Sequence, residues 1–420
     1  MNVRKLALDA IEKIIVKKAF ANICVNEFLS TYELSKEDRA LFTNIVYGTV
    51  QYLITIEYYL EPFVRKKQKP WVRFLLDMSV YQLVYLDIPE YAVVSEAVNI
   101  ANMKDRQLGN FVNAVLRNFL RTPLRKFRGL NEIDLFSYKY SHPRWLVAFL
   151  MKDYDNETVE KILIENGKVK DVAIRVNTLK ITKEEVKKIF ERDGINYQDT
   201  DLVKNGLIVF DNITQHELVK KGKVVIQGIS SQMVAEVCNP KENSNILDLC
   251  SAPGGKVSHL SALTNNTGSI YACDIYPQKI KLMEKAFKKQ GITNVKPQQI
   301  DARNVKNYVK ERSFDYVLAD APCSGLGVLS HRVDLKYTVT KESIEEVTYL
   351  QEEILESTYK LVKSGGYYIY STCTINKDEN ERQIAKFLRR HDEFVKEEER
   401  IILPFENHID GFYICKMRRL

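Results

Sequence analysis

Residues Asn245–Lys256, Asn-Ile-Leu-Asp-Leu-Cys-Ser-Ala-Pro-Gly-Gly-Lys, determine the architecture of the C-terminal half of the chain. The apolar run from Ile246 to Leu249 predicts a strand, and after the Pro-Gly-Gly turn apolar residues recur at helical spacing up to Leu263. Glycines at such a junction let the backbone approach a ligand at the helix N-terminus. The spacing matches neither dinucleotide-binding nor phosphate-binding glycine motifs, so it favours neither a nicotinamide cofactor nor a nucleoside triphosphate.

Four further strands are predicted, and each ends in a carboxylate or a cysteine. They span Ser269–Asp274, Pro297–Asp301, Phe314–Asp320 and Gly366–Cys373. Because ligands of doubly wound sheets bind at the carboxyl ends of the strands, these side chains should converge on one crevice. Asp274 lies about 20 residues past the loop, where a carboxylate accepts hydrogen bonds from ribose hydroxyls. The pattern therefore supports an adenosyl cofactor.

Two strand ends carry cysteines, in Asp320-Ala-Pro-Cys323-Ser-Gly and Ser371-Thr-Cys373-Thr. Together with Cys-Ser-Ala-Pro-Gly-Gly-Lys at 250–256, these motifs closely resemble, in order and position, those of the Sun/Fmu family of RNA cytosine-C5 methyltransferases, which use S-adenosylmethionine. The resemblance implies a C-terminal, Rossmann-like α/β class I methyltransferase domain over residues 222–420. It also implies that the methyl donor is S-adenosylmethionine and that no metal takes part.

The resemblance also assigns roles to residues. It implies that Cys373 is the nucleophile, that Cys323 serves the release step, and that Asp320 binds the ring edge of cytosine and borders the cofactor site. It places the methionine part of the cofactor against seven loop residues, which are Cys250, Ser251, Ala252, Pro253, Gly254, Gly255 and Lys256. Asp274 would bind the ribose and Asp301 the adenine amino group, although both carboxylates are also suited to capping strand ends.

Apolar stripes at helical spacing, with no strand-type alternation, predict an all-α bundle over residues 1–125. Two stretches, at 38–49 and 109–118, resemble the RNA-binding helical domain of the antitermination factor NusB, which also precedes the catalytic part in RsmB-type members of the family. Residues 101–140 hold eight Lys/Arg against three acidic residues. This charge suits either a solvated helix face or a phosphate-binding surface. The candidates for RNA contact are Arg117, Arg121, Arg125 and Arg128.

Residues 126–221 are predicted to form a linker and a small α/β domain. Strands are expected at 172–178 and 207–210, with a capped helix over Thr182–Asp193 between them. Family members have a module like an RNA-recognition motif here, but this sequence lacks the aromatic ribonucleoprotein signature. The sequence departs from the family at Gly228, Ile229, Ser330 and Val333. The changes at Ser330 and Val333 put some contacts to the RNA backbone in doubt.

Composition limits the class of protein. The 420 residues are 45% hydrophobic and 28% charged with a net charge of +7, and neither an 18-residue apolar run nor a signal peptide occurs, so we expect a cytoplasmic protein that binds no membrane. The seven cysteines form no Cys-x-x-Cys pair, and the six histidines are scattered, which disfavours disulfides and metal sites. The expected partner is RNA, above all 16S rRNA, bound by a monomer.

Three other functions compete with this interpretation. A DNA cytosine methyltransferase would take its nucleophile from the Pro322-Cys323 loop alone, whereas this chain has a second cysteine, Cys373. An exocyclic-amine methyltransferase would carry Asn/Asp-Pro-Pro-Tyr at the position of Asp320–Cys323. An RNA-binding assembly factor with a vestigial cofactor site would not need every motif residue to be present.

Overall fold

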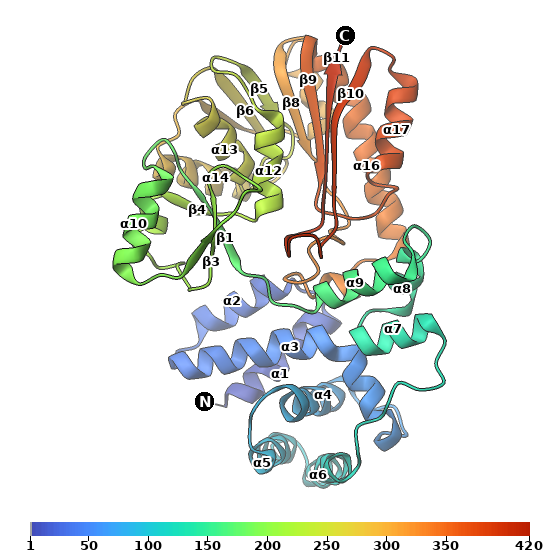
Figure 1. Ribbon diagram of the computed structural model, residues 1–420. Coiled ribbons are helices and arrows are strands. Elements are labelled where there is room, and N and C mark those ends of the chain that lie inside the picture. The colour runs from blue at the N-terminus through green and yellow to red at the C-terminus, as the bar shows by residue number, and fades with distance from the viewer. Residues whose placement is uncertain (1) are drawn as a thin grey trace. The chain divides into compact units, whose positions relative to one another are not determined.

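The computed structural model describes residues 2–420 and divides into two compact units (Figure 1). The helical unit holds the chain up to Lys168 together with Leu329–Thr340, and the α/β unit holds Val169–Val328 and Lys341–Leu420. Over the residues described, no helix is both long and apolar enough to cross a membrane.

The predicted N-terminal bundle is confirmed, and its helices continue to Asn166. Ser35 caps α3 by accepting a hydrogen bond from the Asp38 N–H. Gly48 lets α3 and α4 pack closely, because a Cβ at this position would lie 1.9 Å from the Tyr81 ring. The helices are α1 (Val3–Val16), α2 (Ala21–Thr31), α3 (Lys36–Leu60), α4 (Pro70–Tyr85), α5 (Glu90–Asn102), α6 (Arg106–Arg121), α7 (Glu132–Tyr140), α8 (Arg144–Leu150) and α9 (Asn156–Asn166).

The helical unit also takes a segment from the middle of the chain, Leu329–Thr340, which contains the short helix α15 (Leu335–Thr338). Val333 is part of the core of the bundle. Lys336 is 1% exposed and donates hydrogen bonds to the carbonyls of Gln51 (2.7 Å) and Ser141 (3.0 Å). The Tyr337 hydroxyl donates to the Val50 carbonyl (2.8 Å). The segment that follows the Cys323 loop is therefore an integral part of the helical unit.

A small antiparallel sheet opens the α/β unit, with strand order β2-β3-β1-β4. The helix predicted here is confirmed with its cap, since Thr182 and Glu185 form a capping box at its N-terminus. The fourth strand lies in the segment expected to lead into the methyltransferase domain. The elements are β1 (Val172–Val176), α10 (Lys183–Asp193), β2 (Tyr197–Asp199), β3 (Gly206–Val209), α11 (Glu217–Lys220) and β4 (Val224–Ile226).

The larger sheet has the order β10-β11-β9-β8-β5-β6-β7. Strands β5 to β9 run parallel, and β11 and β10 add an antiparallel edge. The Rossmann-like prediction is confirmed. The elements are α12 (Ile229–Cys238), β5 (Asn245–Asp248), α13 (Gly255–Leu263), β6 (Ser269–Asp274), α14 (Pro277–Gln290), β7 (Val295–Gln299), β8 (Phe314–Asp320), α16 (Lys341–Thr358), β9 (Val362–Thr372), α17 (Glu381–Arg390), β10 (Phe394–Ile402) and β11 (Phe412–Arg419).

Helices cover both faces of this sheet. Successive residues of each strand point to opposite faces, so each strand contributes to two separate cores. Ile246 of β5 belongs to the core beneath α12, α13 and α14. Its neighbour Leu247 belongs to the core beneath α16 and α17. Helices on both faces leave the carboxyl ends of the strands as the place for a ligand site.

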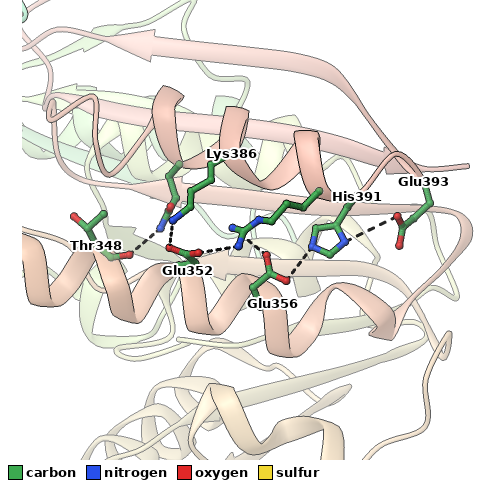
Figure 2. A network of polar contacts seen from close by, with 8 residues as sticks. Thr348, Glu352, Glu356, Lys386, His391 and Glu393 are labelled. Carbon is green, nitrogen blue, oxygen red and sulfur yellow. Dashed lines mark hydrogen bonds and ion pairs between the residues drawn. The ribbon is translucent and has the colours of Figure 1, made fainter.

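Ion pairs join α16 to α17 along their exposed sides (Figure 2). Glu352 binds both Lys386 (2.5 Å) and Arg390 (2.9 Å). Glu356 binds Arg390 (3.2 Å) and His391 (2.9 Å). Exposed pairs contribute little to stability one by one, and here they form a connected series between the two helices.

Candidate active site

The two cysteines singled out in the sequence lie at the ends of adjacent parallel strands. Cys323 follows β8 and Cys373 follows β9, and the strand register pairs Asp320 with Ser371. Their sulfur atoms are 3.3 Å apart, and both side chains are half-buried. The hydrogen bond to Cys373, together with burial, raises the pKa of the Cys323 thiol well above its ordinary value. The structure therefore brings these thiols, 50 residues apart in sequence, into contact.

Asp320 and Lys256 form an ion pair beside the thiols. Lys256 Nζ lies 2.6 Å from Asp320 Oδ2, and the Ser371 hydroxyl donates to Oδ1 (2.8 Å). Burial alone would lower the pKa of Lys256, but the charge and hydrogen bond of Asp320 outweigh it and raise the pKa. The negative charge of a Cys373 thiolate adds to this effect. The ammonium group thus stands among groups that carry or can acquire negative charge.

A cavity of about 400 Å³ opens at the carboxyl ends of the parallel strands. Its walls combine carboxylates with apolar side chains. They are formed by Leu249, Cys250, Ala252, Asp274, Ile275, Tyr276, Lys279, Asp301, Ala302, Arg303, Asp320, Pro322, Leu350 and Ile354. All three predicted carboxylates, Asp274, Asp301 and Asp320, therefore face one cavity.

Only part of the predicted glycine-rich loop borders this cavity, namely Cys250 and Ala252. The Ser251 side chain is buried and donates a hydrogen bond to the Asp248 carbonyl (3.0 Å). Lys256 is directed to Asp320. Pro253, Gly254 and Gly255 shape the turn and do not line the cavity.

The two carboxylates predicted to bind the nucleoside already have partners within the protein. Asp274 accepts hydrogen bonds from the backbone N–H groups of Tyr276 (3.0 Å) and Ala252 (3.3 Å). Asp301 is engaged by the Arg303 guanidinium at 2.7 Å, and this hydrogen bond lowers the pKa of its carboxyl. Each carboxylate retains further lone pairs for a ligand, since an ionised carboxylate accepts about four hydrogen bonds.

Two observations show that the residues present suit an adenosyl cofactor with an amino-acid tail. A Cβ on Gly254, whose φ is +98°, would lie 2.9 Å from the Phe287 ring, so the turn there admits only glycine. Among residues 2–420, Asp248 has a fully buried Oδ2 without a hydrogen-bond partner. Burial, together with the charge of Asp320, raises the pKa of Asp248 to about 7. Asp248 does not itself line the cavity, but the next two residues, Leu249 and Cys250, do.

The sequence analysis missed the apolar wall of the cavity. Leu350 and Ile354 come from α16, four residues apart on one helical face, and Ile275 comes from the turn after β6. A helical stripe is normally attributed to the core, so only its position opposite Asp274 and Asp301 could have indicated a ligand surface. In the part of the chain described, no cluster of His, Cys, Asp or Glu side chains could hold a metal ion.

All four arginines predicted to contact RNA, Arg117, Arg121, Arg125 and Arg128, are exposed. Arg125 differs from the other three, because its guanidinium lies 3.9 Å from the centre of the Tyr58 ring and pairs with Glu61. The structure therefore gives Arg125 a role within the bundle.

Three family models match successive parts of the chain. Residues 235–418 match the family model of 16S rRNA methyltransferase RsmB/F, residues 1–121 match the NusB family, and residues 142–214 match the ferredoxin-like domain of RsmF/B-like methyltransferases.

Relatives match over their full length. A probable ribosomal RNA small subunit methyltransferase B of Bacillus subtilis is 35% identical, covering 100% of this chain and 99% of the relative. A ribosomal RNA small subunit methyltransferase B of Proteus mirabilis is 29% identical, with 100% and 99% covered. A solved structure, "Crystal Structure of PH0851", has a TM-score of 0.84 at 27% identity and covers 100% of this chain and 99% of that one. With the cysteine pair, the carboxylate-lined cavity and three matching domains, the chain belongs to the RsmB/F family of rRNA methyltransferases.

Proposed function

We propose that this chain transfers a methyl group from S-adenosylmethionine to C5 of a cytidine in 16S ribosomal RNA, through a transient covalent bond between Cys373 and C6 of the base. The observation that carries the proposal is the contact between the Cys323 and Cys373 thiols, which are 3.3 Å apart. Pro322, the residue before Cys323, and Asp320 both line the cavity. A transferase acting on a base nitrogen would have no use for two adjacent thiols.

The chemistry explains why a thiol is needed. Cytosine C5 is too weak a nucleophile to take a methyl group unaided, and a thiolate that adds to C6 makes C5 enamine-like. Cys373 attacks C6 and forms the S–C6 bond, and the C5 carbon then accepts the methyl group. The adduct must afterwards lose the C5 proton so that the S–C6 bond breaks and the thiolate leaves.

Cys323 suits the release step. Its raised pKa keeps it protonated in the free enzyme, beside the attacking thiol, so the pair does not consist of two thiolates. After methylation, when Cys373 is bonded to C6 and is no longer a neighbouring thiolate, we propose that Cys323 releases its proton to water. As a thiolate it then takes the C5 proton, while the S–C6 bond breaks and Cys373 regains its electron pair. Sulfur leaves readily from carbon in such eliminations, because a thiolate is a stable anion.

Asp320 and Lys256 are proposed to position the base. Asp320 lines the cavity at the end of β8, the strand that leads into the Cys323 loop, and it accepts hydrogen bonds from Lys256 and Ser371. It would bind the ring edge of a base that has left its stack, as enzymes that react with a base require. When bound, the cofactor would supply an electrophilic methyl group. Asp274 and Asp301 would hold it through its nucleoside and the Cys250–Lys256 loop through its amino-acid part.

The domains divide the work in this proposal. The helical domain of residues 1–125 and the flank that follows it contribute RNA affinity through Arg117, Arg121 and Arg128, and residues 222–420 perform the transfer. The intervening small domain positions the two. Because the relatives are named for the small ribosomal subunit, we propose 16S rRNA in the cytoplasm as the substrate of a monomeric enzyme.

The test compares two variants under denaturing conditions after incubation with substrate RNA and cofactor. Cys373→Ala should form no covalent species, because the attacking thiol is absent. Cys323→Ala should retain attack and methylation but stall at release, which leaves a slowly migrating protein–RNA band. An adduct in Cys373→Ala and none in Cys323→Ala would reverse the assignment. Bisulfite sequencing of RNA from a strain lacking the gene would identify the cytidine, and full methylation there would refute the proposal.

A further inference from the structure

We propose that Glu379 is a positioning residue that ties the loop after Cys323 to the loop after Cys373 and so holds the two thiols together. The proposal deepens the proposed function and rests on it. Glu379 lies in the turn before α17 and is 0% exposed. A fully buried carboxylate is costly unless several hydrogen bonds stabilise it.

The first set of these bonds comes from the Cys323 loop. The residue after this cysteine, Ser324, donates its backbone N–H to Glu379 Oε2 (2.8 Å) and its hydroxyl to Oε1. Gln351 of α16 donates to the same Oε2 (3.0 Å) and to the Pro322 carbonyl (2.8 Å). The carboxylate is thereby connected to the residues on both sides of Cys323.

The second set comes from the Cys373 loop. Thr374, the residue after this cysteine, donates its hydroxyl to Glu379 Oε1 (3.4 Å), and Asn376 donates its amide to the same atom (3.0 Å). The hydroxyls of Thr374 and Ser324 are also 2.8 Å apart. One carboxylate therefore joins the residues that immediately follow the two cysteines.

The site requires an acceptor with no hydrogen of its own. Five hydrogen bonds reach the two oxygens of Glu379, and none of the donors is charged. Burial raises the pKa of this carboxyl, and the bonds from Ser324, Asn376 and Gln351 counter it. Glutamine has nearly the same shape but would place an N–H group against one set of donors. The substitution Glu379→Gln should therefore disrupt this hydrogen-bond network.

The remainder of the frame is rigid. The Tyr370 hydroxyl of β9 donates to the Glu379 carbonyl (2.7 Å), which fixes the backbone of the turn. Glu379 precedes α17 and Gln351 lies on α16, so the bond between them ties the turn to the neighbouring helix. Reacting groups must be held within a fraction of an ångström for efficient chemistry, and this frame supplies that constraint for the thiols.

The decisive measurement is the rate at which Cys323 and Cys373 form a disulfide when the folded protein is treated with diamide. Two thiols lose two protons and two electrons, and the azo group of diamide gains them. The product is mapped by mass spectrometry. The wild type should form the Cys323–Cys373 bond rapidly, and Glu379→Gln should form it at least about tenfold more slowly, because misplaced groups lose reactivity steeply with distance.

A matched control separates positioning from general stability. Glu352→Gln weakens the ion pairs between α16 and α17 but leaves both cysteine loops untouched, so it should cross-link like the wild type. For RNA methylation, Glu379→Gln should lower kcat by roughly a hundredfold with little change in cofactor affinity. Glu379→Asp, which keeps the charge, should restore part of the rate.

Two results would contradict the positioning role of Glu379. The proposal would be overturned if Glu379→Gln cross-linked at the wild-type rate and kept the wild-type kcat. It would also be overturned if Glu379→Gln and Glu352→Gln lost the same fraction of their cross-linking rate. The cross-linking assay needs no RNA, so a slow Glu379→Gln in a protein that fails to methylate cytidine would sustain the positioning role while refuting the proposed function.

Discussion

Asp274 tests the cofactor assignment with a single side chain. We expect Asp274→Ala to weaken S-adenosylmethionine binding, because two charge-assisted hydrogen bonds to ribose hydroxyls are removed. The cost should be about 1.5–3 kcal/mol, roughly ten- to a hundredfold in affinity, measured by calorimetry. Asp315→Ala is the control, since this carboxylate lies near the other end of β8 and binds Lys363 (2.7 Å). Equal affinities of Asp274→Ala and the wild type would remove Asp274 from the site.

Asp77 predicts how the stability of the helical unit depends on pH. It is 1% exposed, and burial raises the pKa of its carboxyl from 3.8 to about 7, although Arg73 nearby lowers it. Between these two values the folded protein binds more protons than the unfolded chain, so the free energy of unfolding falls as pH rises. Above the folded-state pKa of Asp77, the free energy of unfolding does not fall further on account of this group.

Asp77→Asn should therefore remove this loss. Its melting temperature relative to the wild type should be higher at about pH 8 than at about pH 5, on either side of the folded-state pKa. Asp9→Asn, which affects an exposed ion pair with Lys5, should show no such trend. A difference between Asp77→Asn and wild type that is independent of pH would contradict the prediction.

The sequence predicted the carboxylates of the site far better than Glu379. Asp274 and Asp320 each end an apolar run, and such an end is the local signal of a ligand site in a parallel sheet. Glu379 stands among polar residues, Asp378 to Glu381, a pattern typical of an exposed helix start. Its partner Ser324 is 55 residues away, and no local pattern encodes a burial created by so distant a contact.

Secondary-structure elements also differ in how well the sequence predicted them. Strands predicted at Ser269–Asp274 and Phe314–Asp320 are confirmed to the residue, because each is a compact apolar run bounded by polar residues. The inclusion of Leu329–Thr340 in the helical unit was not predicted. Its apolar residues do not reveal which part of the chain they pack against, and one of its main contacts is made by a buried lysine, which sequence patterns assign to the surface.

Lys336 tests whether α15 depends on this contact. Burial lowers the pKa of its ammonium to about 7, yet the group binds two backbone carbonyls. Lys336→Ala should lower the melting temperature, because each carbonyl left buried and unpaired costs about 1–3 kcal/mol. Lys341→Ala, at the exposed start of α16, should leave it unchanged. Indistinguishable melting of the two variants would show that the carbonyls find other partners.

Binding to RNA involves the molecule as a whole, because it sums many weak interactions with phosphates. Changing Arg117, Arg121 and Arg128 to Gln should flatten the dependence of log K on log salt, by about 0.7–0.9 for each phosphate that the variant no longer neutralises. The control removes the same charge from an exposed face of α14, through Lys281, Lys285 and Lys288. Filter binding over a range of salt concentrations measures both. Equal slopes in the two triple variants would make the basic flank an ordinary solvated surface.

Because Leu329–Thr340 belongs to the helical unit, the polypeptide passes between the units three times, after residues 168, 328 and 340. A protease that cuts only near Val169 would therefore sever the backbone without separating the two fragments. The C-terminal fragment carries Val333 and Lys336, whose side chains stay buried in the helical unit formed by the N-terminal fragment. The two fragments should elute together on gel filtration under native conditions and separate only in denaturant. For the same reason, the two fragments should associate when they are expressed from separate genes.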